Sequence, residues 1–319
     1  MSTLAPWLEE VWRQWQTNLA ASRFSNATLL SAEKGMGTEP LVSRFAQALM
    51  CSNDEQDACG FCHSCQLMQS NSHPDYHYIA PEKSGKSITV DQVRQYNRVA
   101  QESSQLSGFR LFVIEPAEAM NESAANALLK TLESPAENCF FLLITTQVNE
   151  LLSTIKSRCQ QWHIANPEPQ LLTAWLTSHV SKPIPEYAAH IHGNSPLSTR
   201  EFVEKGLDAE YKKIEQLFLS FLSGTEDGVN LAKLLASHED SLLWLWFLLS
   251  DAQKRSFSIT EPFFTPGSET LASLLSYDTL YKHTTSLGRL REQLAHHTGL
   301  NKELLILNWL FEFNGEVCL

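Results

Sequence analysis

The stretch ATLLSAEKGMGTEPLV (residues 27–42) reads as a short buried strand, a glycine-rich turn around Gly35 and Gly37, and the start of a helix. This order is typical of a phosphate-binding loop, in which the motif G-x-x-x-x-G-K-[ST] surrounds phosphates with backbone N–H groups and supplies a lysine and a hydroxyl. Two glycines are also common in an ordinary surface turn. The stretch therefore predicts either a nucleotide-binding fold or an ordinary surface turn, and the segments that follow favour the nucleotide-binding fold.

The side chains that bind nucleotide are missing from this loop. Ala32 and Gly37 occupy the two glycine positions of the motif. Thr38 stands where the lysine belongs, and Glu39 stands where the hydroxyl belongs. Lys34 lies four residues too early to replace the lysine. Because a carboxylate at position 39 would repel phosphate, we predict a fold that has lost its nucleotide chemistry, and we expect no bound ATP.

Length and composition indicate a folded protein with about two or three domains. The chain has 319 residues, of which 43% are apolar and 19% are charged, and its net charge is −12. Such a charge argues against a wide surface for DNA or acidic membranes, so partners would have to supply most of the positive charge. The first fifteen residues lack the apolar core of a secretory signal, and the longest apolar run, residues 242–249, is too short to span a bilayer. We expect a cytoplasmic protein without a membrane segment.

Four cysteines in the region of about residues 50–70 are spaced like a metal site. The segment CSNDEQDACGFCHSC places thiols, with gaps of seven, two and two residues, at Cys51, Cys59, Cys62 and Cys65. Four thiolates complete a tetrahedral shell around Zn²⁺, and Gly60 suits the tight reversal that such a knuckle needs. A shell filled by protein ligands predicts a structural zinc and not a catalytic one. The alternatives are free thiols, or replacement of one cysteine by His63 or His73.

A second part of the ATPase machinery is also altered. Residues 109–115 read FRLFVIE, a continuous apolar run of the kind that forms a buried parallel strand. In phosphate-loop enzymes this strand ends in an Asp that holds Mg²⁺, and in many of them a Glu that orients the attacking water comes next. Glu115 and Pro116 occupy these two positions here. The hydrolytic base is therefore missing together with the lysine.

Alternating strands and helices continue through the first half of the chain. Apolar patterns predict a strand, two helices and a strand at residues 76–80, 88–99, 121–133 and 139–145. We place residues 154–159 in a helix that follows the last of these strands. Beyond Pro167 the patterns are helical to the end of the chain, with a short helix expected at residues 187–191.

Three motifs carry a resemblance to a known family: NALLKTLESP at residues 126–135, FFLLITT at 140–146 and IKSRCQ at 155–160. They resemble clamp-loader subunits of the AAA+ ATPase superfamily. The four-cysteine insertion, the opening Pro6-Trp7-Leu8 and the altered phosphate loop narrow the resemblance to the delta-prime subunits of bacterial DNA polymerase III. The specific motifs cover roughly the first two thirds of the chain, and the rest is similar mainly in length and helical character.

The resemblance implies an α/β fold with three domains. They are a RecA-like AAA+ parallel-sheet domain with the zinc-binding insertion, a helical lid and an all-α collar, at residues 1–166, 167–207 and 208–319. It further implies a non-hydrolysing stator that supports ATP-driven loading of the sliding clamp onto primed DNA. Its partners would be the clamp-loader ATPase subunits and the delta subunit. The chain would belong to a DNA polymerase holoenzyme without hydrolysing ATP by itself.

The resemblance also assigns a role to Ser157-Arg158-Cys159, the functional signature of the family. Arg158 would act as an arginine finger in trans, because a guanidinium supplied to a neighbouring subunit neutralises charge that develops on the γ-phosphate of its ATP. Ser157 would cap or orient, and Cys159 would pack. The alternative for Arg158 is a helix-end arginine that satisfies carbonyls or pairs with a carboxylate. Thr145 or Thr146, at a strand end, matches the sensor position of the family.

Two other functions stay open at this point. An active ATPase with a divergent loop would release phosphate from ATP as an isolated chain. A zinc-dependent nucleic-acid-binding module would lose DNA binding when zinc is removed. Against the second, residues 51–70 contain no Lys or Arg and so lack the electrostatic footprint for phosphate.

Overall fold

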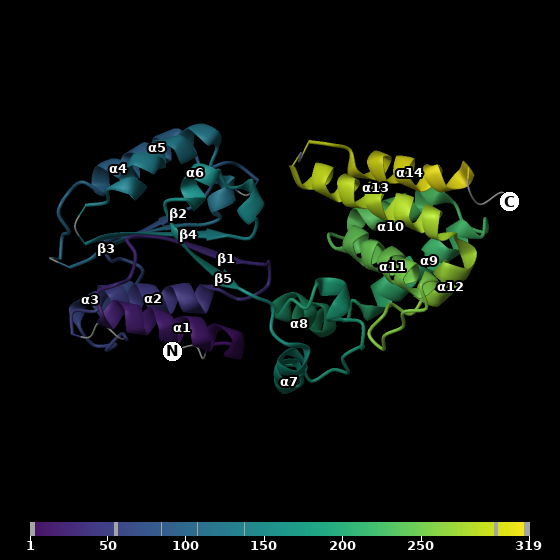
Figure 1. The fold of residues 1–319 in the computed structure, drawn as a ribbon, viewed down its shortest axis with the longest axis horizontal. Helices are drawn as coiled ribbons and strands as arrows, with labels where there is room; N and C mark the ends of the chain where they lie inside the picture. Colours follow the sequence, from purple (N-terminus) through teal and green to yellow (C-terminus); the bar gives the residue numbers. More distant parts are fainter. Residues whose placement is uncertain are drawn as a thin grey trace. The chain divides into compact units, whose positions relative to one another are not determined.

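The computed structural model describes residues 4–53, 57–83, 85–106, 108–136, 138–296 and 299–315. The chain divides into two compact units, residues 1–167 and 168–319. Within the first unit, helices cover a parallel sheet, and within the second, the described elements are helical (Figure 1). The predicted α/β architecture followed by a helical region is confirmed.

The sheet of the first unit has five strands in the order β2-β3-β4-β1-β5, and every neighbouring pair is parallel. Their bounds are β1 Ala27–Ala32, β2 Tyr76–Ile79, β3 Arg110–Ile114, β4 Cys139–Thr145 and β5 Gln160–Ile164. Every residue of β1, β3 and β4 is buried. Strands buried on both faces read as continuous apolar runs, which is why the sequence pattern identified these three.

Helices pack on both faces of the sheet (Figure 1). One face carries α1 Pro6–Ala20, α2 Glu39–Met50 and α3 His63–Gln69, and the other carries α4 Val90–Val99, α5 Glu122–Glu133 and α6 Ser153–Lys156. Successive strand residues point to opposite faces, so Leu142 joins the apolar core beneath α1 and α2, whereas Phe141 joins the core beneath α4 and α5. The sheet therefore lies between two separate apolar layers, and its loops emerge at the two edges where the strands begin and end.

The segment around Arg158 differs from the predicted helix. The helix α6 ends at Lys156, and residues 157–159 form a turn that leads into β5. Strand β5 was not predicted, because its residues QQWHI are mostly exposed at the edge of the sheet and form no apolar run. The prediction that residues 154–159 are helical is therefore wrong, and Arg158 lies in a turn.

A buried ion pair fastens the amino-terminal edge of the sheet. Arg110, the first residue of β3, places Nε 3.4 Å from Oδ1 of Asp75, and both side chains are almost fully buried. The Asp75 carboxylate also accepts hydrogen bonds from the backbone N–H groups of Gln105 and Leu106. The guanidinium donates in addition to the backbone carbonyls of Val99, Glu102 and Ser103. The pair thus connects two strands to the loop that follows α4.

The second unit contains eight α-helices within its described residues. They are α7 Pro169–His179, α8 Pro196–Lys205, α9 Asp208–Leu222, α10 Gly228–Ser237, α11 Ser241–Ser256, α12 Ser268–Leu274, α13 Tyr277–His296 and α14 Lys302–Phe311. A single apolar core extends from Leu172 in α7 to Phe313 beyond α14. The helix expected at residues 187–191 is instead the short 3-10 helix His190–His192, which ends at Gly193 with φ of 61°. The division at residue 207 stays a prediction.

Candidate functional site

The phosphate-loop region has the predicted backbone order. Strand β1 ends at Ala32, the turn follows, and α2 begins at Glu39 with a proline in its first turn. Gly35 and Gly37 have φ of 85° and 68°, a left-handed conformation that favours glycine. The strand, turn and helix of a nucleotide-binding fold are therefore present.

Protein contacts hold this loop in place. The side chain of Met36 is buried, and the indole Nε1 of Trp7 in α1 donates to the Met36 carbonyl at 2.9 Å. Asn166 donates from Nδ2 to Oε2 of Glu33 at 2.9 Å. Thr38, the residue before α2, makes no side-chain capping hydrogen bond. The turn is thus anchored to α1 and to the segment after β5.

Carboxylates gather at the carboxyl-terminal edge of the sheet, beside this loop. The Tyr78 hydroxyl donates to Oε2 of Glu115 at 3.1 Å. Burial raises the pKa of Glu115; the hydrogen bond from Tyr78 opposes this shift, and the charges of Glu39 and Glu118 add to it. The negative charges of these carboxylates oppose the binding of a triphosphate beside them.

The predicted sensor position is occupied within the chain. Glu118 accepts from the backbone N–H of Thr146 at 3.1 Å and from its hydroxyl at 2.8 Å. The Thr145 hydroxyl accepts from the backbone N–H of Gln147 at 3.0 Å. Both threonine side chains therefore have partners that are not nucleotide. Sequence patterns alone missed Glu118 and Tyr78, because each meets its partner across the sheet.

The four cysteines come together at one point. The Sγ atoms of Cys51 and Cys62 are 4.0 Å apart, and those of Cys59 and Cys65 are 3.9 Å apart. All four sulfurs lie within 4.8 Å of one another. A tetrahedral shell with Zn–S bonds of about 2.3 Å would separate its sulfurs by about 3.8 Å. The cluster could therefore hold a metal ion such as zinc.

Backbone groups and burial act on these thiols in opposite directions. Three N–H groups each donate to a sulfur at 3.4 Å: Cys59 to Cys51, Cys62 to Cys59 and Cys65 to Cys62. Burial opposes ionisation of Cys62, yet the N–H groups of Ser52 and Cys65 lower the pKa of its thiol to about 6. Burial raises the pKa of Cys65 to about 12. A bound cation would favour the thiolate at every position, because the thiolate is the ligand form.

Neither histidine near the cluster belongs to it. The group of possible ligand atoms contains the four cysteines alone among the described residues. His73 is buried, and its Nδ1 accepts from the backbone N–H of Asp75 at 3.2 Å. Burial lowers the pKa of His73, which favours the neutral ring. His73 thus stabilises a turn, and the four-cysteine arrangement is the one that the geometry supports.

Arg158 lies on the surface of the first unit. Its side chain is 29% exposed, and its Nε donates to Oε1 of Glu133, the last residue of α5, at 2.9 Å. Its Nη1 donates to the carbonyl of Thr154 at 3.0 Å. The Ser157 hydroxyl donates to the same carbonyl at 3.1 Å, and Cys159 is buried against the sheet core. In the single chain Arg158 therefore has the carboxylate and carbonyl partners that the alternative interpretation expected.

Strand register shows how far Arg158 lies from the phosphate loop. Gln160, two residues after Arg158, pairs with Thr28, whereas the loop begins after Ala32 at the other end of β1. At about 3.3 Å per residue, the four residue steps from Thr28 to Ala32 place the start of β5 and the loop about 13 Å apart along the sheet. Arg158 and the phosphate loop of its own chain therefore lie at opposite edges of the sheet.

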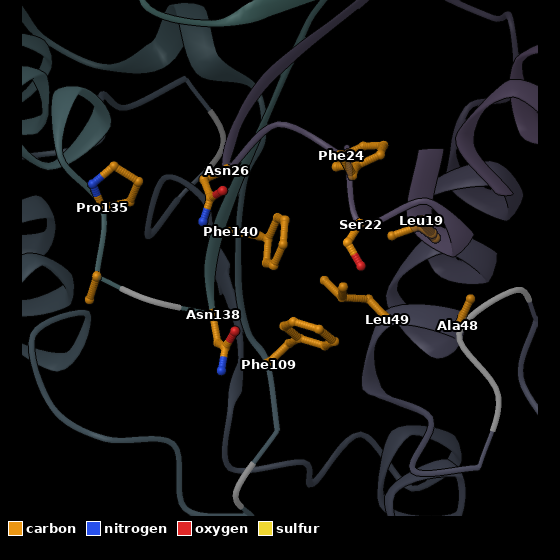
Figure 2. Close-up of a pocket in the computed structure, with 11 residues that line it drawn as sticks. Leu19, Ser22, Phe24, Asn26, Ala48, Leu49, Phe109, Pro135, Asn138 and Phe140 are labelled. Carbon is orange, nitrogen blue, oxygen red and sulfur yellow. The ribbon is translucent and has the colours of Figure 1, made fainter. Parts of the chain in front are cut away.

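A cavity of about 490 Å³ lies at the amino-terminal edge of the sheet, and Figure 2 shows the residues that line it. The rings of Phe24, Phe109 and Phe140 line it. Its size falls in the range of small-molecule sites. The side chain of Asn26, which also lines it, donates to the Cys139 carbonyl at 2.8 Å. The cavity contains neither the phosphate loop nor the cysteines, and the sequence did not predict it.

Comparison with known proteins assigns the family. The family described as "DNA polymerase III, delta subunit" matches residues 7–168, and "DNA polymerase III, delta subunit, C terminal" matches residues 206–315. The DNA polymerase III subunit delta-prime of Haemophilus influenzae is 32% identical to this chain, and the alignment covers 99% of each. The chain belongs to the DNA polymerase III delta-prime family. The delta-prime subunit of Escherichia coli is 33% identical, with 96% of this chain and 93% of the relative covered.

A solved structure gives a further comparison for this member of the delta-prime family. A DNA polymerase III gamma subunit-related protein from Thermotoga maritima is 16% identical, with a TM-score of 0.44 and coverage of 98% of this chain and 100% of the other. Within the described part of the chain, no helix has both the length and the apolar character needed to cross a bilayer.

Proposed function

We propose that the chain is a non-hydrolysing subunit of the bacterial clamp loader, which works in the cytoplasm and supports ATP-driven loading of the sliding clamp onto primed DNA. Membership of the delta-prime family supports the proposal that the chain joins this assembly, with the clamp-loader ATPase subunits and the delta subunit as partners. The altered loop supports the lack of hydrolysis. Thr38 and Glu39 replace the lysine and hydroxyl, and Glu115 adds a second carboxylate.

Arg158 is the residue that we assign to catalysis, in the active site of a neighbouring subunit. Two observations support this role: its side chain is partly exposed, and it lies at the edge of the sheet opposite the loop of its own chain. A guanidinium supplied in trans stabilises the charge that develops on a transferring phosphoryl group. Ser157, which donates to the Thr154 carbonyl, helps to shape the turn.

The cysteine cluster is proposed to hold a structural zinc ion. Four thiolates would leave no open coordination position, so the ion would stabilise the connection between α2 and α3 without taking part in chemistry. A Cys62→Ser variant should retain less than one zinc per chain when metal is measured by inductively coupled plasma mass spectrometry of the purified, desalted protein. Full zinc content together with unchanged thermal stability in that variant would contradict the proposal.

The helical second unit is proposed to contain a lid at residues 167–207 and a collar at 208–319 that holds the subunits in a ring. The C-terminal family match begins at residue 206, close to the proposed start of the collar. A fragment of residues 208–319 should then assemble with the partner subunits in size-exclusion chromatography. Failure of the folded fragment to join them, where the whole chain does, would contradict the assignment.

The catalytic proposal is tested in the assembled clamp loader. Replacing Arg158 by Ala should lower DNA-stimulated ATP hydrolysis at the neighbouring site by about 10³-fold or more, the range of well-studied arginine fingers. The ATP hydrolysis that remains in this variant would come from the other active sites of the ring. Arg200→Ala is a suitable control, because Arg200 is also a surface arginine paired with a glutamate. Equal rates for the Arg158→Ala and wild-type assemblies would contradict the proposal.

A further inference from the structure

Glu133 is placed where a helix disfavours an acidic residue. It is the last residue of α5, and the carbonyl groups at the C-terminus of a helix give that end a partial negative charge. A cation is the expected residue there, and Lys130 in the same turn follows this rule. The carboxylate of Glu133 therefore needs a compensating positive charge, and Arg158 is the arginine that supplies it.

The contacts between the two residues occupy one edge of the guanidinium. Both Nε and Nη2 of Arg158 donate to the same oxygen, Oε1 of Glu133. Nη1 donates to the carbonyl of Thr154. A guanidinium carries five N–H bonds in a rigid plane, in which Nε–H and one N–H of Nη2 form the side edge. Three donations to described residues therefore leave one N–H on each terminal nitrogen.

The two terminal nitrogens, Nη1 and Nη2, together form the end edge of the fork. A parallel pair of N–H bonds on this edge is the arrangement that binds two oxygens of a carboxylate or phosphate. The Arg158 side chain is 29% exposed and the Glu133 side chain is 52% exposed, so the pair lies at the surface. The side edge of the guanidinium is thus held within the chain, while each terminal nitrogen keeps one N–H that is not used by these contacts.

We propose that Glu133 is a positioning residue, which holds the side edge of Arg158 so that the end edge faces a phosphate bound by the neighbouring subunit. This inference rests on the proposed role of Arg158 in trans. A free arginine side chain has several rotatable bonds, and holding it near its working orientation before assembly lowers the entropic cost of reaching the transition state. The opposite role would be sequestration, in which Glu133 competes with phosphate for the guanidinium.

The direction in which one substitution changes kcat distinguishes these two roles. In the assembled clamp loader, Glu133→Ala should lower the Arg158-dependent part of kcat for ATP roughly tenfold, because a misplaced catalytic group loses rate. KM for ATP should stay unchanged, since the finger acts in the transition state and not on ground-state binding. Glu133→Gln, which keeps an acceptor oxygen for the side edge, should recover part of the loss. A higher kcat in Glu133→Ala would overturn the inference in favour of sequestration.

Two further variants distinguish positioning from a structural role. Glu204→Ala removes an exposed carboxylate that accepts from Nε of Arg200 at 2.8 Å, and it should leave kcat unchanged. In the Arg158→Ala background, Glu133→Ala should cause no additional loss, because the two residues act as one unit. An equal additional loss in that background would mean that Glu133 acts through the fold, and the inference would fail.

The failure of this inference is distinguishable from failure of the proposed function. If Arg158→Ala leaves the ATPase rate of the assembly unchanged, the role of Arg158 in trans is wrong, and the inference is wrong with it. If Arg158→Ala lowers the rate and Glu133→Ala does not, the inference alone is wrong. Size-exclusion chromatography of each assembly must show the same complex, so that the rates refer to equal amounts of ring.

Discussion

The two edges of the sheet in the first unit differ in the partners of their carboxylates. At the amino-terminal edge, the acidic residues are paired with arginine: Asp75 with Arg110, and Glu133 with Arg158. At the carboxyl-terminal edge, Glu115 accepts a hydrogen bond from a tyrosine hydroxyl, and Glu118 accepts from Thr146. Carboxylates held by neutral donors therefore lie at the nucleotide edge, whereas two paired guanidinium groups lie at the opposite edge, away from the phosphate loop.

This difference is the basis on which we propose that the chain serves an ATP-dependent assembly without binding ATP itself. Phosphate recognition needs cations or N–H donors at the loop, and carboxylates at the same place act against it. The chain keeps the backbone of the loop through Gly35 and Gly37 but carries Thr38 and Glu39 in the decisive positions. The cation that we assign to a phosphate, Arg158, lies at the opposite edge of the sheet from this loop.

The largest effect is expected at the amino-terminal edge, from Asp75→Ala. This change leaves the buried guanidinium of Arg110 and the N–H groups of Gln105 and Leu106 without their acceptor. Breaking a buried ion pair costs about 3–5 kcal/mol of unfolding free energy, which urea denaturation would measure. Glu10→Ala, which removes an exposed partner of Arg13, should cost less than about 1 kcal/mol. Equal, small losses of unfolding free energy in both variants would show that the buried pair stabilises the fold no more than an exposed pair does.

A smaller effect of opposite sign is expected at the carboxyl-terminal edge, from Glu115→Gln. Because burial raises the pKa of Glu115 above its usual value of 4.5, ionisation favours the unfolded chain. The fold thus loses stability as pH rises from 4.5 through the raised pKa, and the loss is complete above it. Glu115→Gln should therefore have a higher unfolding free energy than the wild-type chain near pH 8.

The pH dependence provides the control for that variant. Below pH 4.5 the carboxyl is protonated in both states, so Glu115→Gln and the wild-type chain should have equal stability in thermal unfolding. Both side chains can accept the hydrogen bond from Tyr78, which keeps the comparison limited to charge. A destabilised variant at pH 8 would show that the Glu115 charge has a stabilising partner, and the contrast between the edges would be wrong.

The smallest effect is expected from restoring the loop residues. The double substitution Thr38→Lys and Glu39→Thr returns the lysine and the hydroxyl of the motif. Glu115 and Glu118 still oppose phosphate, and Trp7 still fixes the turn through the Met36 carbonyl. We therefore expect the dissociation constant for ATP with Mg²⁺ to stay above about 1 mM in equilibrium dialysis. A micromolar dissociation constant for the double variant would show that the residues at these two positions alone prevent ATP binding.

Sequence patterns predicted the elements whose information is local. Continuous apolar runs identified β1, β3 and β4, because strands buried on both faces need apolar residues at every position. The cysteine spacing predicted the cluster, because a metal shell constrains the separation of its ligands along the chain. Strand β5 was missed, because an exposed edge strand needs no apolar run.

Contacts between distant segments were not predictable in this way. Arg158 meets Glu133 from 25 positions away, and Tyr78 meets Glu115 from 37 positions away. Pairings of this kind depend on the order of the strands, which the residue pattern does not encode. One signal was available for Glu133, since an acidic residue at the C-terminus of a helix breaks the usual preference for a cation.

The central claim is that this chain has no working nucleotide site of its own. Isothermal titration calorimetry of the purified chain with ATP and Mg²⁺ tests it most directly, with a clamp-loader ATPase subunit titrated under the same conditions as the positive control. We expect no saturable heat for this chain up to about 1 mM ATP. Saturable binding with a micromolar dissociation constant would contradict it.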